Sequence, residues 1–233
     1  MPMSPKLLRP RATGFNPKSI SGLRLWLDAA NTSSFTLNGS GVSQWSDGSG
    51  SGNHFVQATS NNQPSRTDTQ NGKSVVTFDG SNDRLATASA ISLGTGGYTV
   101  FIVGYHGGGF QVMMEGGTLN PYLSSNSDNS TGFNHFDGAV AVSSAAGTYS
   151  TNTWFVLEYV ISQSSRIISV NGSQVASGSG TSRAASIQYL GATANGFYWG
   201  GRFAEVLIYG SALTLQRSTV RKYLGSKWGI TVA

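Results

Sequence analysis

The segment that most constrains the fold is the last thirty residues, where one strand pattern leads into one amphipathic helix pattern. Residues 204–209 (AEVLIY) are rich in β-branched and aromatic residues, which favours a strand. Thr214 is a suitable N-cap, and we predict a helix over 214–228. Its apolar stripe recurs every four residues: Val220, Leu224 and Trp228. Because no other segment has a convincing helical period, this stripe must pack on a β-sheet.

The remainder of the chain reads as short strands separated by turns. Residues 98–105 (YTVFIVGY) are apolar on both faces, which predicts a central strand. Residues 154–161 alternate, and we expect Glu158 to lie on the solvated side. Asn171-Gly172 between two apolar runs is a strong hairpin signal. Roughly a dozen such segments indicate an antiparallel sandwich, not a parallel α/β fold.

Composition limits the classes of protein that fit. A chain of 233 residues with 38% hydrophobic content can build one sandwich core. The absence of cysteine excludes disulfides and thiol chemistry. No apolar run approaches membrane-spanning length, and the N-terminus lacks the apolar core of a signal peptide. We therefore expect no membrane partner and no export by such a signal.

The net charge of +5 is concentrated at the N-terminus, because five basic residues precede the first acidic one, Asp28. They are Lys6, Arg9, Arg11, Lys18 and Arg24. Residues 1–20 also contain four prolines and little apolar content, so we predict an extended basic arm, with the sandwich over 21–233. A nucleic acid would complement this charge, but five basic residues without interleaved aromatics are a weak signal for nucleic-acid binding. An acidic protein surface fits as well.

Four blocks of sequence carry a family resemblance. They are GLRLWLDAANTSSFT, VSQWSDGSGSGNHFVQ, GKSVVTFDGSNDRL and AEVLIYGSALTLQRSTVRKYLGSKWGI. In this order they resemble the LamG-like jelly-roll modules of the concanavalin A-like lectin/glucanase superfamily, of the kind found in phage structural proteins. The resemblance spans about residues 22–230 and implies an all-β, antiparallel jelly-roll β-sandwich. It says little about function, because this fold carries many unrelated tasks.

The superfamily includes glucanases, so the placement of the acidic residues decides whether hydrolysis is expected. Glycoside cleavage needs two carboxyl groups that face one bond. Here Glu115, Glu158 and Glu205 stand alone in separate predicted strands. We therefore expect no enzymatic activity and no catalytic residues. The histidines are far apart without ligand spacing, so we expect no zinc site either: His54, His106 and His135.

Two loops could bind glycans, because sugar rings stack on exposed aromatic faces beside polar groups. In the first, Asn195 precedes Phe197, Tyr198 and Trp199. The second contains Asn134 and Asp137. Adjacent residues of a strand point to opposite sides, so at least one of the three aromatics should be exposed. The alternative for Tyr198 or Trp199 is that it covers the end of the core.

Calcium is the one metal that deserves a test, since related sandwiches use it at a loop edge. Asp79, Asn82 and Asp83 supply oxygen atoms within five residues. The same residues also cap turns by bonding to their own backbone, and we favour that interpretation. We expect no cofactor, with calcium as the alternative.

Two functions fit these features. The first is a non-enzymatic structural, decoration or fibre protein on the surface of a virion or another extracellular particle. Its arm would bind shell proteins and copies of the chain, and its lectin-like sandwich would face cell-surface glycans. The anchoring residues would be Lys6, Leu7, Leu8, Arg9, Arg11, Phe15 and Lys18. The second is a free carbohydrate-binding module, assisted by calcium.

Overall fold

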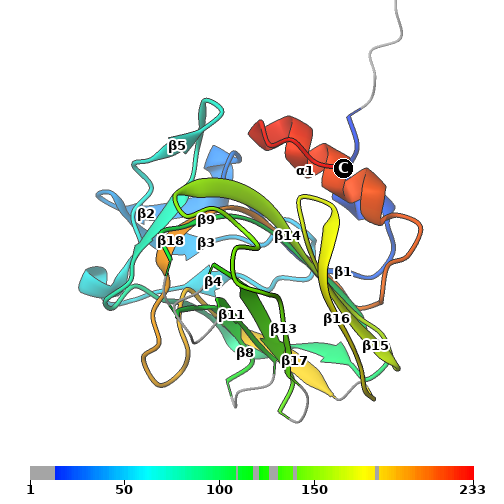
Figure 1. Ribbon diagram of the computed structural model, residues 1–233. Helices are drawn as coiled ribbons and strands as arrows, with labels where there is room; N and C mark the ends of the chain where they lie inside the picture. The colour runs from blue at the N-terminus through cyan, green and yellow to red at the C-terminus, as the bar shows by residue number, and fades with distance from the viewer. Residues whose placement is uncertain (1–13, 109, 118–120, 126–130, 139–140, 182–183) are drawn as a thin grey trace, which may run out of the picture.

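The computed structural model describes residues 14–108, 110–117, 121–125, 131–138, 141–181 and 184–233. Two antiparallel sheets stack face to face, and one helix, α1 (Arg217–Trp228), lies on the outside of one of them (Figure 1). This confirms the predicted all-β sandwich with a short C-terminal helix. In the described part of the chain, no helix is long and apolar enough to cross a membrane.

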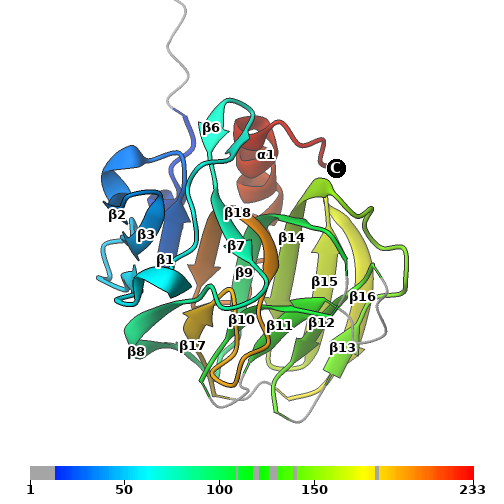
Figure 2. The same cartoon turned by 90° about the vertical axis from the view of Figure 1, so that its left-hand side faces the viewer.

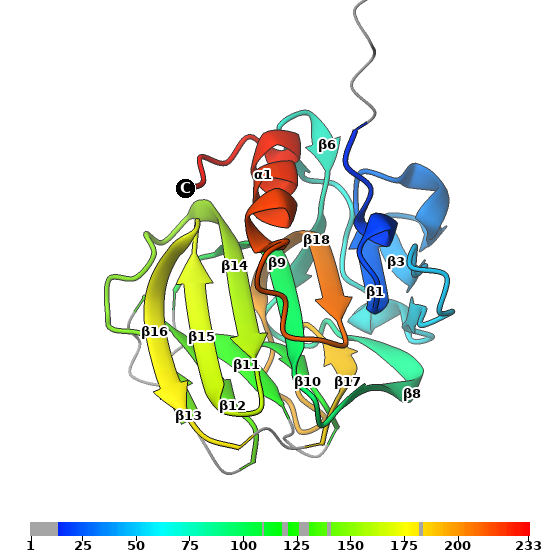
Figure 3. The same ribbon diagram turned by 90° about the vertical axis from the view of Figure 1, so that its right-hand side faces the viewer.

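The sheet beneath α1 has seven strands, in the order β1-β18-β9-β14-β15-β16, with β7 also paired to β18. Figure 3 shows the six strands of the main path side by side, with α1 over them. The bounds are β1 Leu23–Asp28, β7 Val76–Asp79, β9 Tyr98–His106, β14 Thr153–Ile161, β15 Ser165–Val170, β16 Ser173–Ser179 and β18 Gly200–Tyr209. The apolar run at 98–105 is β9, which pairs with both β14 and β18 and is central as predicted.

The second sheet has nine strands, in the order β13-β12-β11-β10-β17-β8-β4-β3-β2. Their bounds are β2 Phe35–Asn38, β3 Gly41–Trp45, β4 Phe55–Val56, β8 Leu85–Gly94, β10 Val112–Glu115, β11 Tyr122–Ser125, β12 Phe133–Phe136, β13 Ala141–Ser143 and β17 Ala185–Leu190. A small hairpin joins β5 (Thr69–Gln70) to β6 (Lys73–Ser74). Short 3₁₀ turns complete the described structure: η1 Pro17–Ser19, η2 Thr32–Ser34 and η3 Ser60–Asn62.

Aromatic side chains fill the space between the sheets. Phe133 of β12 lies 5.0 Å, between ring centroids, from Phe155 of β14 and 4.7 Å from Tyr149. His135 points the same way, since it bonds to the Tyr98 hydroxyl. Alternation along β12 therefore turns Asn134 and Phe136 to the outer face of the nine-stranded sheet. Burying large aromatics of this kind contributes much of the stability of a core.

The apolar stripe of α1 is confirmed, because Val220, Leu224 and Trp228 are completely buried. The predicted start at Thr214 is wrong, since the helix begins at Arg217 with Gln216 as its N-cap. The reason is a tether to β9: the Thr99 hydroxyl donates to the Ser211 carbonyl and accepts from the Leu213 backbone N–H. That tether holds the chain against the sheet before the helix can begin.

Glu158 also differs from the sequence expectation. It points to the outer face of the seven-stranded sheet as predicted, yet its side chain is completely buried beneath α1. Arg217 and Arg221 of the helix donate to its carboxylate, at 3.1 Å and 2.5 Å. The two guanidinium groups replace the water that the alternation pattern predicted, because the helix covers this part of the sheet.

The described end of the predicted arm packs on the sandwich. Phe15 lies 5.3 Å, between ring centroids, from Tyr223 of α1. The Tyr209 hydroxyl donates to the Pro17 carbonyl, and Ile20 is buried. Residues 14–20 are thus part of the surface of the sandwich, whereas the sequence placed the boundary at residue 20. The anchor residues Lys6, Leu7, Leu8, Arg9 and Arg11 lie outside the described residues.

Candidate functional site

The outer face of the nine-stranded sheet carries a row of aromatic side chains, which we call the aromatic face: Phe110, Tyr122, Phe136 and Phe197. Tyr122 and Phe136 are directly opposite each other on β11 and β12, so both point outward. Phe110 lies 5.9 Å from Tyr122 and 5.5 Å from Phe197, between ring centroids. The row thus runs from the loop before β18 to the β12 strand, and Phe197 at its end is 52% exposed.

A tight turn sets the orientation of Phe197. The Thr193 hydroxyl oxygen accepts hydrogen bonds from the backbone N–H groups of Asn195 and Phe197, at 3.1 Å and 3.2 Å. The Thr193 N–H in turn donates to the Phe197 carbonyl. This closed turn projects Phe197 from the protein and returns the next residues to the sheet. Asn195 is exposed beside it and offers a carboxamide.

Three buried polar atoms on the same side of the sheet have no hydrogen-bond partner: Glu115 Oε1, Ser124 Oγ and Asn134 Oδ1. Ser124 and Asn134 are opposite each other on β11 and β12, and Glu115 on β10 is opposite Tyr122. The other Glu115 oxygen accepts from the Ala194 N–H at 2.6 Å. A buried acceptor without a partner costs about 1–3 kcal/mol. Because all three atoms are buried, a ligand donor would reach them only if the covering side chains moved.

Two further contacts shape the electrostatics of this face. Burial, reinforced by the negative charge of Glu115, raises the pKa of Tyr122 to about 12. Tyr122 therefore keeps its hydroxyl proton at neutral pH and can donate it. At the other side of Glu115, the Arg84 guanidinium lies over the Tyr189 ring, 5.0 Å from its centroid. Aromatic rings, hydrogen-bond donors and hydrogen-bond acceptors thus occur together on the aromatic face.

The predicted first loop is divided by its own turn. Phe197 and Asn195 are exposed and Tyr198 is half-buried, as a binding loop requires. Trp199 is completely buried, so its predicted role as a sugar platform is wrong. Its ring stacks on His106 at 4.2 Å and lies 5.5 Å from Phe203. Trp199 instead closes the end of the core, the alternative that the sequence left open.

The predicted second loop is divided in the same way. Asn134 points to the aromatic face, but Asp137 is 4% exposed and forms an ion pair with the completely buried Arg166. Alternation puts Asp137 with Phe133 and His135, on the inner side of β12. Asp137 therefore cannot meet a ligand on the aromatic face, and its assignment to a glycan site is wrong.

The calcium candidates do not fit a metal site. Asp79 Oδ1 accepts from the backbone N–H groups of Ser81, Asn82 and Asp83. Asp83 Oδ2 accepts from the Asp79 N–H, and burial raises the Asp83 pKa to about 6. These are the bonds of a capped turn. The described residues contain no group of three or more histidine, aspartate or glutamate side chains placed to hold a metal ion.

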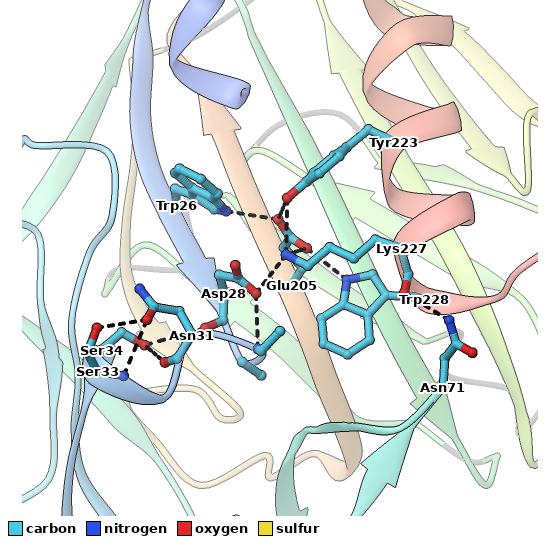
Figure 4. Close-up of polar contacts among 12 residues, drawn as sticks. Trp26, Asp28, Asn31, Ser33, Ser34, Asn71, Glu205, Tyr223, Lys227 and Trp228 are labelled. Atoms are coloured by element: carbon cyan, nitrogen blue, oxygen red, sulfur yellow. Dashed lines mark hydrogen bonds and ion pairs between the residues drawn. The ribbon is translucent and has the colours of Figure 1, made fainter. Parts of the chain in front are cut away.

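Figure 4 shows the polar cluster that encloses Glu205. Its side chain is completely buried, and it accepts hydrogen bonds from Trp26 Nε1 at 2.8 Å and from Tyr223 and Trp228 Nε1 at 2.7 Å. Lys227 Nζ lies 2.7 Å from both Glu205 and Asp28. The sequence blocks AEV and KWG thus meet in a single polar cluster that docks α1. Glu115 lies on the other sheet, so these glutamates do not face one bond.

Sequence reasoning missed Phe110 and Tyr122. Phe110 follows a glycine run, and Tyr122 lies in a short predicted strand, so neither carries a local signal of its own. What brings them together is the pairing of β10, β11 and β12, which depends on residues far apart in the chain. The polar stretch 124–138 with scattered aromatics was the available hint, since Phe136 alternates with core residues there.

No protein-family model and no curated protein sequence matches the chain. Solved structures do resemble it. Domain 4 of AbnA, an extracellular arabinanase of Geobacillus stearothermophilus solved with arabinotriose, is 15% identical with a TM-score of 0.60, over 85% of this chain and 97% of that one. The binding domain of Paraclostridial Mosquitocidal Protein 1 is 14% identical with a TM-score of 0.62, over 92% and 56%.

A Trypanosoma rangeli sialidase variant is 15% identical with a TM-score of 0.60, over 90% of this chain but 34% of its own length. The chain thus spans about a third of that enzyme, nearly all of the arabinanase domain and about half of the mosquitocidal structure. At these identities the likenesses concern the fold alone. The chain is a β-sandwich domain of the architecture found in these glycosidase-associated and binding domains.

Proposed function

We propose that this domain binds neutral carbohydrate chains on the aromatic face and does not cleave them. The observation that carries the proposal is the continuous row from the 52% exposed Phe197 through Phe110 to Tyr122, beside the unpaired buried oxygen of Glu115. Sugar rings present C–H faces that pack on aromatic rings and hydroxyl groups at their edges. The aromatic row packs on the C–H faces of the sugar rings, and the polar atoms form hydrogen bonds with the sugar hydroxyl groups.

The hydrogen-bonding groups match hydroxyl groups better than charged ligands. The unpaired atoms of Glu115 and Asn134 are acceptors, the Ser124 hydroxyl can accept or donate, and Tyr122 can donate. A sugar hydroxyl both donates and accepts, so it can satisfy each of them. An anionic ligand would meet the Glu115 carboxylate, which disfavours it. The arabinotriose complex of the similar arabinanase domain also supports a neutral saccharide.

The absence of catalysis is part of the proposal. The Glu158 and Glu205 carboxylates are held under α1 by cations and N–H donors, and Glu115 lies on the opposite sheet. A general acid and a nucleophile must reach one glycosidic oxygen and one anomeric carbon together. We therefore expect no release of reducing sugar from polysaccharides that the domain binds.

The test is retention on an array of neutral oligosaccharides that includes arabinotriose. Phe197→Ala and Phe110→Ala should each weaken retention about tenfold, which is ~1.4 kcal/mol, with the melting temperature nearly unchanged. Leu215→Ala is the matched control, since Leu215 is 86% exposed but belongs to the segment before α1. Equal retention of both phenylalanine variants and wild type would refute the aromatic face as the binding site.

We also propose that residues 1–13 attach the domain to a larger particle, such as a virion, and to further copies of the chain. The supporting observation is the charge: of the five basic residues that precede Asp28, three lie in this segment, Lys6, Arg9 and Arg11. Residues 14–20 are packed on α1 and β18, so any attachment through the N-terminal segment has a fixed starting point beside the helix. This role combines with glycan binding, since the aromatic face lies on the other sheet.

The packing of Phe15 and Pro17 dictates where to truncate. Deleting residues 1–13 keeps the Phe15–Tyr223 contact and the Tyr209–Pro17 hydrogen bond, so the melting temperature should not change. Sedimentation velocity should show self-association of the full chain and a monomer after deletion. If both forms sediment identically as monomers, self-assembly through residues 1–13 is refuted, while glycan binding is unaffected.

A further inference from the structure

A groove on the opposite side of the molecule points to a second binding site. We propose that the surface around Tyr105 and Arg202, at the end of the seven-stranded sheet left free by α1, binds a second neutral saccharide unit. The groove has a volume of about 330 Å³, near the lower end of the roughly 300–1,000 Å³ range of small-molecule sites. Its lining includes Thr77, Asp79, Tyr105, Asn152 and Arg202.

Four neighbouring strands build the floor of this groove. Cross-strand pairing aligns Thr77 of β7, Arg202 of β18, Tyr105 of β9 and Trp154 of β14 in one row on the outer face of the sheet. Figure 2 shows these four strands together, with α1 at their upper end. The Tyr105 and Trp154 rings lie 5.6 Å apart, between centroids. Half-buried aromatics on regular strands form a rigid platform.

Arg202 is held in place on two sides. Its Nε donates to Asp68 Oδ2 at 2.7 Å, and its guanidinium lies over the Tyr105 ring, 4.5 Å from the centroid. Hydrogen bonds from Arg202 and Thr77 lower the pKa of Asp68, so the ion pair persists at neutral pH. The five N–H donors of the Arg202 guanidinium outnumber its hydrogen bonds to Asp68 and Tyr105, so donors remain for a ligand. A fixed donor of this kind loses little entropy when a ligand binds.

The charges around the groove select against anions. Arg202 is the one cation among the lining residues, while Asp68 neutralises it and Asp79 adds a negative charge. Burial opposes ionisation of Asp79, but the N–H groups of residues 81–83 outweigh it and lower its pKa. The local sum is one negative charge, which disfavours phosphate and carboxylate ligands. The N–H donors of Arg202 and Asn152 and the Oδ2 acceptor of Asp79 fit the hydroxyl groups of a neutral sugar. Asn152 Oδ1 and Asp79 Oδ1 already accept hydrogen bonds, from the Tyr105 hydroxyl and from backbone N–H groups.

Two glycines at the start of β18 allow close packing beneath the groove. A Cβ atom on Gly201 would lie 2.3 Å from the Tyr105 carbonyl oxygen, and one on Gly200 would lie 3.0 Å from the Gln111 side chain. Side chains are therefore excluded here by close packing. The connection from β9 to β10 carries Gly107 at this groove and Phe110 at the aromatic face. The two sites thus lie at the same end of the sandwich, on opposite sheets.

This inference extends the proposed function, since both sites would take neutral saccharides, and its test separates the two. Backbone and Trp154 indole NMR signals of the full chain would be followed during titration with arabinotriose and other neutral trisaccharides. Signals of Gly107, Gly201 and Trp154 should shift. Arg202→Gln should weaken the binding that these signals report about tenfold, whereas Phe197→Ala should leave it unchanged.

Matched variants control for loss of structure. Arg66 lies over the Phe35 ring at 4.4 Å, much as Arg202 lies over Tyr105, so Arg66→Gln should leave the groove signals unchanged. Asn152 has a φ of 59°, which glycine tolerates, so Asn152→Gly removes its amide without strain and should also weaken binding. Asn71→Gly, at a φ of 48°, is its control.

Three results would overturn the second site. The groove signals could stay unchanged while those of the aromatic face shift, which would leave the proposed function intact. If no signal of the protein shifts at all, both proposals fail for these saccharides. Tighter binding of trigalacturonate than of neutral trisaccharides at the groove would refute the charge argument.

Discussion

On the outer face of the seven-stranded sheet, Glu158 and Glu205 lie under α1, and cations or N–H groups occupy their carboxylate oxygens. On the outer face of the nine-stranded sheet, Glu115 is equally buried, yet one of its oxygens has no partner and the residues around it are aromatic. The same residue type in the same kind of strand position therefore has two different roles. Satisfied carboxylates hold the fold together, and we propose that an unsatisfied one, beside the exposed Phe197 and half-buried aromatic rings, suits a ligand.

Neutralising one glutamate on each face should give the largest difference in stability between the two faces. Glu205→Gln leaves Lys227 with one carboxylate fewer in a buried cluster, so the free energy of unfolding should fall by about 3–5 kcal/mol. Glu115→Gln keeps an acceptor for the Ala194 N–H and should cost less than about 1 kcal/mol. Urea unfolding of both variants measures the difference. Equal losses would show that the two carboxylates play the same structural part.

Phe197 and Trp199 differ in the same way, although they lie two residues apart in one loop. Trp199→Ala removes a completely buried ring stacked on His106, so we expect a loss of about 3–5 kcal/mol in the free energy of unfolding. Phe197→Ala removes a half-exposed ring and should cost under about 1 kcal/mol while weakening saccharide binding. A stable Trp199→Ala variant with impaired binding would reverse these assignments.

Acid should destabilise the interior between the two faces. Burial lowers the pKa of His106 and of His135 to about 4, below the ordinary value of 6.5. Between these values the unfolded chain binds more protons, so the free energy of unfolding falls as pH falls from 6.5 towards 4. At pH 5 each histidine contributes a loss of about 2 kcal/mol, and Asp83, whose pKa is raised to about 6, offsets about 1 kcal/mol.

NMR titration of the two imidazole rings checks this directly. Both should remain neutral down to about pH 4.5 in the folded protein, and urea unfolding at pH 7 and pH 5 should show the loss of stability. Titration of either ring near pH 6.5 would contradict its burial in the core.

The smallest expected effect concerns calcium at the turn formed by Asp79, Asn82 and Asp83. Because backbone N–H groups already occupy Asp79 Oδ1, addition of calcium or of a chelator should leave the melting temperature unchanged. Differential scanning calorimetry with and without 5 mM calcium, roughly the concentration that weak extracellular sites require, is the measurement. A rise of several degrees would mean that the turn binds the ion.

Local patterns predicted the parts of the fold that depend on neighbouring residues. The stripe of Val220, Leu224 and Trp228 identified the helix, since a period of four is visible in the sequence. The solvation of Glu158 was predicted wrongly, because its partners Arg217 and Arg221 lie about sixty residues away in the chain. Alternation indicates which side of a strand a residue occupies, but it cannot show what covers that side.

The candidate site was predictable only in part, for the same reason. Alternation required one exposed aromatic among Phe197, Tyr198 and Trp199 but could not choose between them. The Thr193 turn, which fixes Phe197 outward, decides this in the folded chain. Phe110 and Tyr122 join the site through ring contacts that no local pattern encodes.

We propose that the face with unpaired polar atoms binds saccharide, whereas the cluster covered by the helix is structural. The most direct measurement is the NMR chemical-shift change on addition of a neutral trisaccharide. It compares the ring signals of Phe110, Tyr122 and Phe197 with the signals of the two indole N–H groups that donate to Glu205, those of Trp26 and Trp228. We predict shifts in all three rings and none in the two indoles. Shifts confined to the indoles, or absent from the three rings at saturating saccharide, would contradict the account.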